Sequence, residues 1–118
     1  MIKKWELRFN SKPRIVSGSM WNDPVLTLFG DDWGFNTLSS WRIMVGNQLV
    51  VGFDEQSAVD FLGDFVGQAV SAAVGLSGID PVLKFENGLV LEIFVTHSVE
   101  PWTYRDSVDT IVGASTQG

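Results

Sequence analysis

His97 is the residue of this chain best suited to acid–base chemistry, because an imidazole titrates near neutral pH. Ser98 and Glu100 follow it closely and could supply a nucleophile and an orienting carboxylate. Ser98 is adjacent to His97, however, and neighbouring residues at the end of a strand point to opposite sides. The spacing therefore does not predict a catalytic arrangement, and we expect no enzymatic activity.

Asp31 and Asp32 form a second candidate site, since carboxylate oxygens are ligands of Mg²⁺ and Ca²⁺. They lie between Gly30 and Gly34, but the alternating acids and terminal Glu of a calcium-binding loop are absent. We interpret the segment as a solvated turn in which both glycines serve the turn geometry. With no cysteine and one histidine in the chain, we expect neither a metal site nor a cofactor.

The acidic charge of the chain is its strongest functional signal. The 118 residues carry 14 Asp and Glu against 8 Lys and Arg, which gives a net charge of −6. Five of the eight cations lie in the first fourteen residues: Lys3, Lys4, Arg8, Lys12 and Arg14. A negative potential repels nucleic acid and anionic membranes and favours encounter with basic proteins, although net charge also serves solubility.

The length predicts one domain, residues 1–118, which can bury a core without disulfides or metals. No apolar run of 18 residues is present, and the basic N-terminus lacks the apolar stretch of a signal peptide. We therefore expect a cytoplasmic protein that does not span a membrane.

Apolar alternation predicts several strands. Trp5, Leu7 and Phe9 have the period of a half-buried strand, and further strands are expected at 25–29, 41–45, 49–53 and 68–76. The strands at 41–45 and 49–53 are expected to form a hairpin around Gly46-Asn47-Gln48. A hairpin is expected over 81–95, with Gly88 in a left-handed bulge so that Phe85 faces Leu89 and Leu83 faces Leu91. That register keeps one face of the hairpin apolar.

One helix is predicted over 54–66, capped by Asp54 and stopped at Gly67. Its apolar residues fall on one face: Ala58, Val59, Phe61, Leu62, Phe65 and Val66. Its other face carries Gln56, Asp60, Gly63 and Asp64. We therefore expect an α+β fold, in which a twisted antiparallel sheet of about six strands has this main helix packed on one face.

An internal echo relates two parts of the chain. Asp23-Pro24-Val25-Leu26 recurs as Asp80-Pro81-Val82-Leu83, and each copy leads to a tryptophan-bearing segment at Trp41 or Trp102. The echo suggests a hairpin duplication that relates 23–43 to 80–105, with both hairpins in one sheet.

The segments Trp41-Arg42-Ile43, Gly46 to Gly52, Phe85 to Ile93 and Pro101-Trp102 resemble a group of small uncharacterised bacterial α+β proteins. The resemblance covers about residues 38–105 and brings no catalytic residues. Some small acidic proteins of this kind are immunity proteins encoded beside secreted toxins. The resemblance thus implies a bacterial origin and a binding role.

Five tryptophans in 118 residues add to this expectation, because aromatic side chains are enriched at binding hot spots. Trp21, Trp33 and Trp102 fall in or near expected turns, where they serve as anchors or cover the ends of the core. We therefore expect a non-enzymatic acidic protein that neutralises a basic protein, such as a toxin or nuclease domain. The expected partner-binding residues are Asp31, Asp32, Trp33, Gln56, Asp60 and Asp64.

Two other functions remain open from the sequence. A small-ligand-binding or enzymatic domain would need a concave pocket in which polar groups converge. A structural subunit of a larger assembly, for example a phage-related one, would present a large apolar interface.

Overall fold

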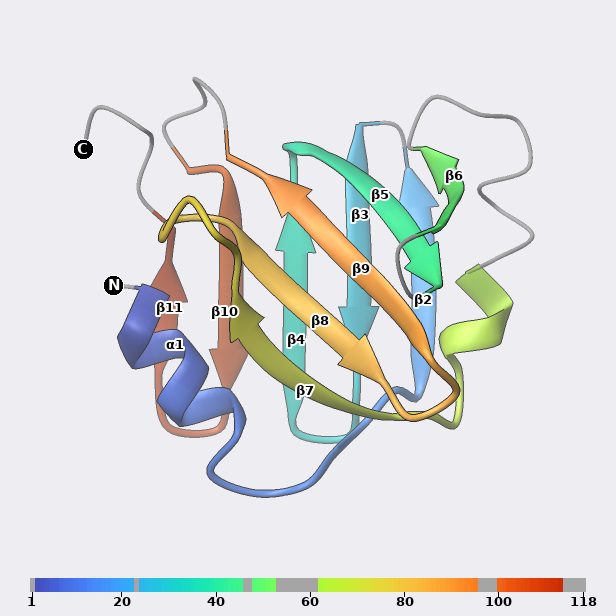
Figure 1. The fold of residues 1–118 in the computed structure, drawn as a ribbon. Helices are drawn as coiled ribbons and strands as arrows, with labels where there is room; N and C mark the ends of the chain where they lie inside the picture. Colours follow the sequence, from blue (N-terminus) through green and yellow to red (C-terminus); the bar gives the residue numbers. More distant parts are fainter. Residues whose placement is uncertain (1, 23, 46–47, 53–61, 96–99, 114–118) are drawn as a thin grey trace.

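The chain folds into two antiparallel β-sheets packed face to face, with one N-terminal helix beside them (Figure 1). The computed structural model describes residues 2–22, 24–45, 48–52, 62–95 and 100–113, and for 49–52 it describes the backbone. The six-stranded sheet has the order β1(Arg14–Ile15), β7(Ala69–Val74), β8(Pro81–Phe85), β9(Leu89–Phe94), β5(Ser40–Val45) and β6(Gln48–Gly52). The five-stranded sheet has the order β11(Thr110–Val112), β10(Trp102–Asp106), β4(Trp33–Thr37), β3(Val25–Phe29) and β2(Gly18–Asn22).

The predicted fold class is wrong. A second sheet, rather than one main helix, covers the inner face of the six-stranded sheet. β4, the central strand of the five-stranded sheet, was not predicted, because Gly34 was assigned to a turn. The helices that the structure describes are α1(Ile2–Phe9) and the short 3₁₀ helix η1(Gly63–Phe65).

The N-terminal segment is a helix and not the predicted strand. Trp5 and Phe9 are four residues apart, so a helix places them on one face, and both are fully buried. Leu7, which a strand would bury with them, is 75% exposed. Beyond the helix, the side-chain amide of Asn10 donates to and accepts from the backbone of Ala72, at 2.8 Å each. This contact satisfies backbone groups of β7 next to the two-residue strand β1.

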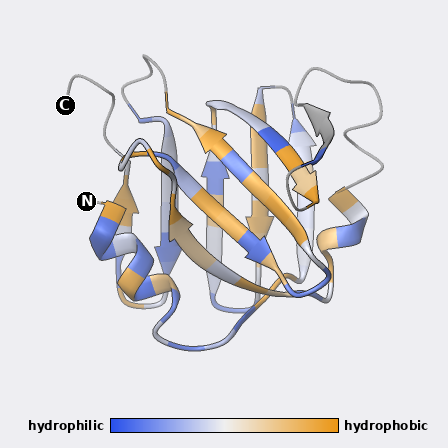
Figure 2. Cartoon of the chain, viewed as in Figure 1, coloured by the Kyte–Doolittle hydropathy of each residue, from blue (hydrophilic) through white to orange (hydrophobic). Residues whose placement is uncertain are grey.

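The hairpin over 81–95 has the predicted register. Leu83 pairs with Leu91, and Gly88 has the left-handed φ of 94°. The six residues expected on the apolar face are all buried: Leu83, Phe85, Leu89, Leu91, Ile93 and Val95. Buried and half-buried residues alternate along β9, as this register requires, and Figure 2 shows that this strand is mostly hydrophobic. The predicted pairing of 41–45 with the strand after Gly46 is also confirmed, as β5 with β6.

The predicted helix over 54–66 falls mostly outside the described residues, which resume at Leu62. Leu62 and Phe65 are buried, and Asp64 is exposed, as expected. Val66 is 45% exposed and extended, so the helix does not reach it and its assignment to the core face was wrong. Gly67 adopts a left-handed φ of 84° after this turn.

The two sheets have equivalent strand connections. A three-stranded meander (β2–β3–β4) in the five-stranded sheet is followed by a hairpin (β5–β6) in the other sheet. The second half repeats this with the sheets exchanged, as β7–β8–β9 and then β10–β11. The echoed segments 25–29 and 81–85 therefore lie in different sheets, which corrects the expectation of one sheet. Duplication of the chain remains a prediction.

Within the described part of the chain, no helix is long and apolar enough to cross a membrane.

Candidate functional site

Trp33 lies in the core and is not an exposed anchor. It is 5% exposed, its ring packs edge-on against Phe9, and its indole N–H donates to the carbonyl of Ile15 at 3.2 Å. Gly30 makes room for this ring, because a Cβ there would stand 2.0 Å from the indole nitrogen. Trp33 therefore positions the start of β4 beneath the β3–β4 turn.

The other tryptophans are also covered. Trp5, Trp41 and Trp102 are at most 2% exposed, and half-buried Trp21 packs edge-on against Trp41 at 5.6 Å. The tryptophans therefore do not support an exposed aromatic binding surface, because their rings fill and close the core between the sheets.

Asp31 and Asp32 are both exposed on the β3–β4 turn, but they have different surroundings. Asp31 accepts a hydrogen bond from the Ser17 hydroxyl at 3.2 Å. Asp32 forms an ion pair with Lys12 and lies 3.8 Å from the guanidinium of Arg14. The hydrogen bond from Lys12 lowers the pKa of the Asp32 carboxyl. Asp31 is therefore the carboxylate of this pair that is free of a described cation.

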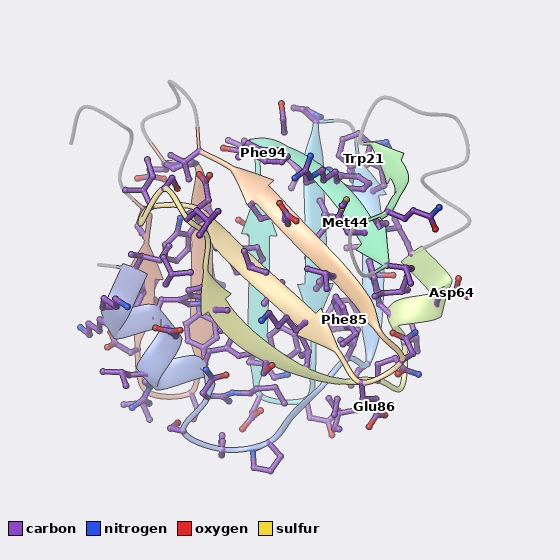
Figure 3. All side chains as sticks on the ribbon, viewed as in Figure 1. Trp21, Met44, Asp64, Phe85, Glu86 and Phe94 are labelled. Carbon is purple, nitrogen blue, oxygen red and sulfur yellow. The ribbon has the colours of Figure 1, made fainter. Side chains whose placement is uncertain are left out.

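Asp64 lies on η1 at another part of the surface. The side-chain amide of Asn87 donates to the Asp64 carbonyl at 3.1 Å, which ties η1 to the β8–β9 turn that also carries Glu86. Figure 3 shows Asp64 and Glu86 at this end of the molecule. We call them the η1 acidic pair. Gln56 and Asp60, predicted to share the surface with Asp64, lie outside the described residues.

Most of the cations are held in ion pairs within the chain. The pairs are Lys3–Glu6, Lys4–Asp109, Arg8–Asp106, Lys12–Asp32, Arg14–Asp32, Arg14–Asp106 and Arg42–Glu92. The basic N-terminal segment is therefore no separate positive pole. Its charge is neutralised by acids of the five-stranded sheet and its turns, and by Glu6.

Asp106 is the centre of a buried polar cluster. Its carboxylate accepts hydrogen bonds from Arg8 at 2.8 Å and from the Tyr104 hydroxyl at 2.8 Å, and Arg14 lies 3.7 Å away. Burial disfavours the ionised carboxylate, but these bonds and two backbone N–H groups outweigh it and hold the pKa of Asp106 well below its usual range. Burial and the bond to Asp106 raise the pKa of Tyr104 well above 10. Because these groups satisfy one another, we interpret the cluster as structural.

Among the described acids, five have no ion pair with a described cation: Asp31, Asp64, Asp80, Glu86 and Glu100. Asp80 accepts the backbone N–H of Val95 and so serves the fold. In the described ranges, no three His, Cys, Asp or Glu side chains gather as a metal site would require. His97 and Ser98 lie outside those ranges, and Glu100 is exposed.

A hollow of about 530 Å³ lies on the outer face of the five-stranded sheet. We call it the Gly34 hollow. It is lined by Thr27, Asp31, Asp32, Trp33, Gly34, Phe35, Asn36, Thr103, Arg105, Asp106 and Ser107. In the sequence, the alternation of buried Trp33, Phe35 and Thr37 with Gly34 and Asn36 was the signal that could have identified β4 and this face. Of the predicted site residues, the structure brings together Asp31, Asp32 and Trp33 here.

No protein family model, curated protein or solved structure was found to match this chain.

Proposed function

We propose that this chain is a non-enzymatic acidic binding protein that neutralises a basic protein in the cytoplasm, as the immunity protein of a bacterial toxin does. The observation that carries the proposal is the distribution of charge. Six of the eight cations are engaged with acids of the same chain, so they are not available to offset the remaining acids toward a partner.

The η1 acidic pair is the part of the surface that best fits such a partner. Asp64 is exposed beside the β8–β9 turn that carries the exposed Glu86. In the sequence, the segment 53–62 that precedes η1 contains Asp54, Glu55 and Asp60 and no Lys or Arg. A concentration of one charge sign steers an oppositely charged partner and speeds encounter.

A growth assay tests the proposal directly. The protein encoded next to this gene is expressed alone and together with the chain in a bacterial host. We expect growth arrest by the neighbour and its relief on co-expression, with a complex of the two proteins recovered by gel filtration. A toxic neighbour that neither binds the chain nor loses its toxicity would contradict the proposal. A harmless neighbour would also contradict the toxin–immunity relationship.

A further inference from the structure

The outer faces of the two sheets can be compared position by position. Thr37 pairs with Trp102 in the five-stranded sheet, and Ile93 pairs with Trp41 in the six-stranded sheet. Counting from these tryptophans, the Phe35–Tyr104 pair corresponds to the Leu91–Ile43 pair. All of these inward side chains are buried, so the two halves build their core on the same register.

The same register aligns the outward positions. The Gly34–Arg105 pair in the five-stranded sheet corresponds to the Val90–Met44 pair in the six-stranded sheet. The next outward pair, Asn36–Thr103, corresponds to Glu92–Arg42. The side chains at equivalent outward positions of the two sheets can therefore be compared directly.

In the six-stranded sheet, side chains cover these outward positions. Met44 is only 9% exposed, and Arg42 forms an ion pair with Glu92 at 3.1 Å. The guanidinium of Arg42 also stands 5.0 Å above the ring of Phe94. Figure 3 shows Met44 and Phe94 on this part of the molecule.

The five-stranded sheet leaves the same positions open. A Cβ on Gly34 would have nothing within 4 Å, and Arg105 is exposed without an ion pair to any described acid. Phe29, which pairs with Gly34 from β3, does not cover it, because the Phe29 ring lies against Gly18 on β2. The fold thus tolerates a filled surface here, and the Gly34 hollow is not a requirement of the architecture.

The hydrogen-bonding groups around the hollow point to a neutral ligand. Arg105 can only donate and the Asp31 carboxylate can only accept, whereas Asn36 and Thr103 can do both. The other two carboxylates of the lining, Asp32 and Asp106, are held in ion pairs with Lys12 and Arg8. A ligand of one charge would be attracted by Arg105 or Asp31 and repelled by the other. β4 is paired on both sides, so its backbone offers no free edge to an extended peptide.

We propose that the Gly34 hollow binds a neutral polyhydroxylated ligand of saccharide type, whose hydroxyl groups donate to Asp31 and accept from Arg105. The volume lies within the range of about 300–1,000 Å³ that is common for small-molecule sites. This inference goes beyond the proposed function and does not rest on it, because neither member of the η1 acidic pair lines the hollow.

The test is an NMR titration of the ¹⁵N-labelled chain with glucose, galactose, mannose, N-acetylglucosamine, maltose and cellobiose. We expect at least one of them to cause saturable shifts of the Gly34, Asn36 and Thr103 amides. Gly34→Val, which copies Val90 of the other sheet, should fold normally and weaken binding by about tenfold or more. Its matched control is Ser71→Val, at an exposed position on the other sheet, which should bind like the wild type.

Three results would overturn the inference. The first is the absence of shifts at these amides with every saccharide of the panel. The second is wild-type binding by folded Gly34→Val. The third is a stronger response of the same amides to inorganic phosphate or to free lysine, which would assign the hollow to a charged ligand.

Discussion

Trp41 and Trp102 occupy equivalent positions in the two sheets. Each is at most 2% exposed and pairs with the inward residue of the neighbouring meander, Ile93 for Trp41 and Thr37 for Trp102. Each also follows the point at which the chain leaves one sheet and enters the other. Two large rings at these crossings fill the space between the sheets, so the packing of both halves depends on them.

Phe65→Ala should destabilise the fold by about 3 to 5 kcal/mol, as large-to-small changes in a core do. Phe65 is fully buried and stacks on Phe85, with ring centroids 4.2 Å apart. Urea unfolding followed by circular dichroism measures the loss. Val66→Ala is the matched control, since that side chain is 45% exposed and should change stability by no more than about 0.5 kcal/mol. Equal effects of the two changes would show that η1 does not dock on β8.

Trp33→Ala should destabilise the fold, and its effect should not be limited to the binding of a partner. The ring is buried against Phe9 and its N–H is bonded to Ile15, so truncation leaves a cavity worth about 3 to 5 kcal/mol. Thermal unfolding measures this change. If the variant kept wild-type stability but its complex dissociated faster, Trp33 would be a binding residue and not a core residue.

The stability of the protein should fall as the pH drops below about 4, in part through Asp106. The folded-state pKa of this carboxyl is depressed, so its contribution is present above its unfolded pKa and is lost as the pH falls toward the folded value. Asp106→Asn should remove this part of the pH dependence. It should also cost about 3 kcal/mol at neutral pH, because buried Arg14 loses a counter-charge.

Urea unfolding of the wild type and Asp106→Asn at a series of pH values measures both effects. Asp64→Asn is the control, since it removes the same charge from an exposed carboxylate outside the Asp106 cluster. If the free energy of unfolding of Asp106→Asn fell with pH below 4 as steeply as that of the wild type, the Asp106 cluster would not contribute to the loss of stability in acid.

Asp64→Lys should slow association with the proposed basic partner by a factor of about 3 or more at low salt and should flatten the salt dependence. Glu100→Lys makes the same change in net charge at another exposed position, so it separates a local contact from the overall field. Stopped-flow binding at several salt concentrations measures both variants. Equal rates for the two would mean that net charge, and not the η1 acidic pair, drives encounter.

Local features whose residue pattern has one physical solution could be predicted from the sequence. The register of the 81–95 hairpin is such a case, because a shift by one residue would have turned Leu83 and Leu91 toward the solvent. The left-handed conformation of Gly88 follows from the same turn chemistry. The strands at 25–29 and 41–45 were also recognisable, since each is a short, mainly apolar run bounded by polar or glycine-containing segments.

Features for which the local residue pattern allows two conformations depend on long-range packing. Trp5 and Phe9 share a face in a helix and in a strand. Only the packing of α1 against β10 of one sheet and β7 of the other, with Leu7 turned to solvent, selects the helix. Gly34 resembles a turn glycine until β3 and β10 pair on either side of it. The candidate sites depend on the same long-range contacts: pairing across the sheet opens the hollow, and ion pairs between distant segments determine which acids remain free. Such contacts join residues far apart in the chain, so no local period encodes them.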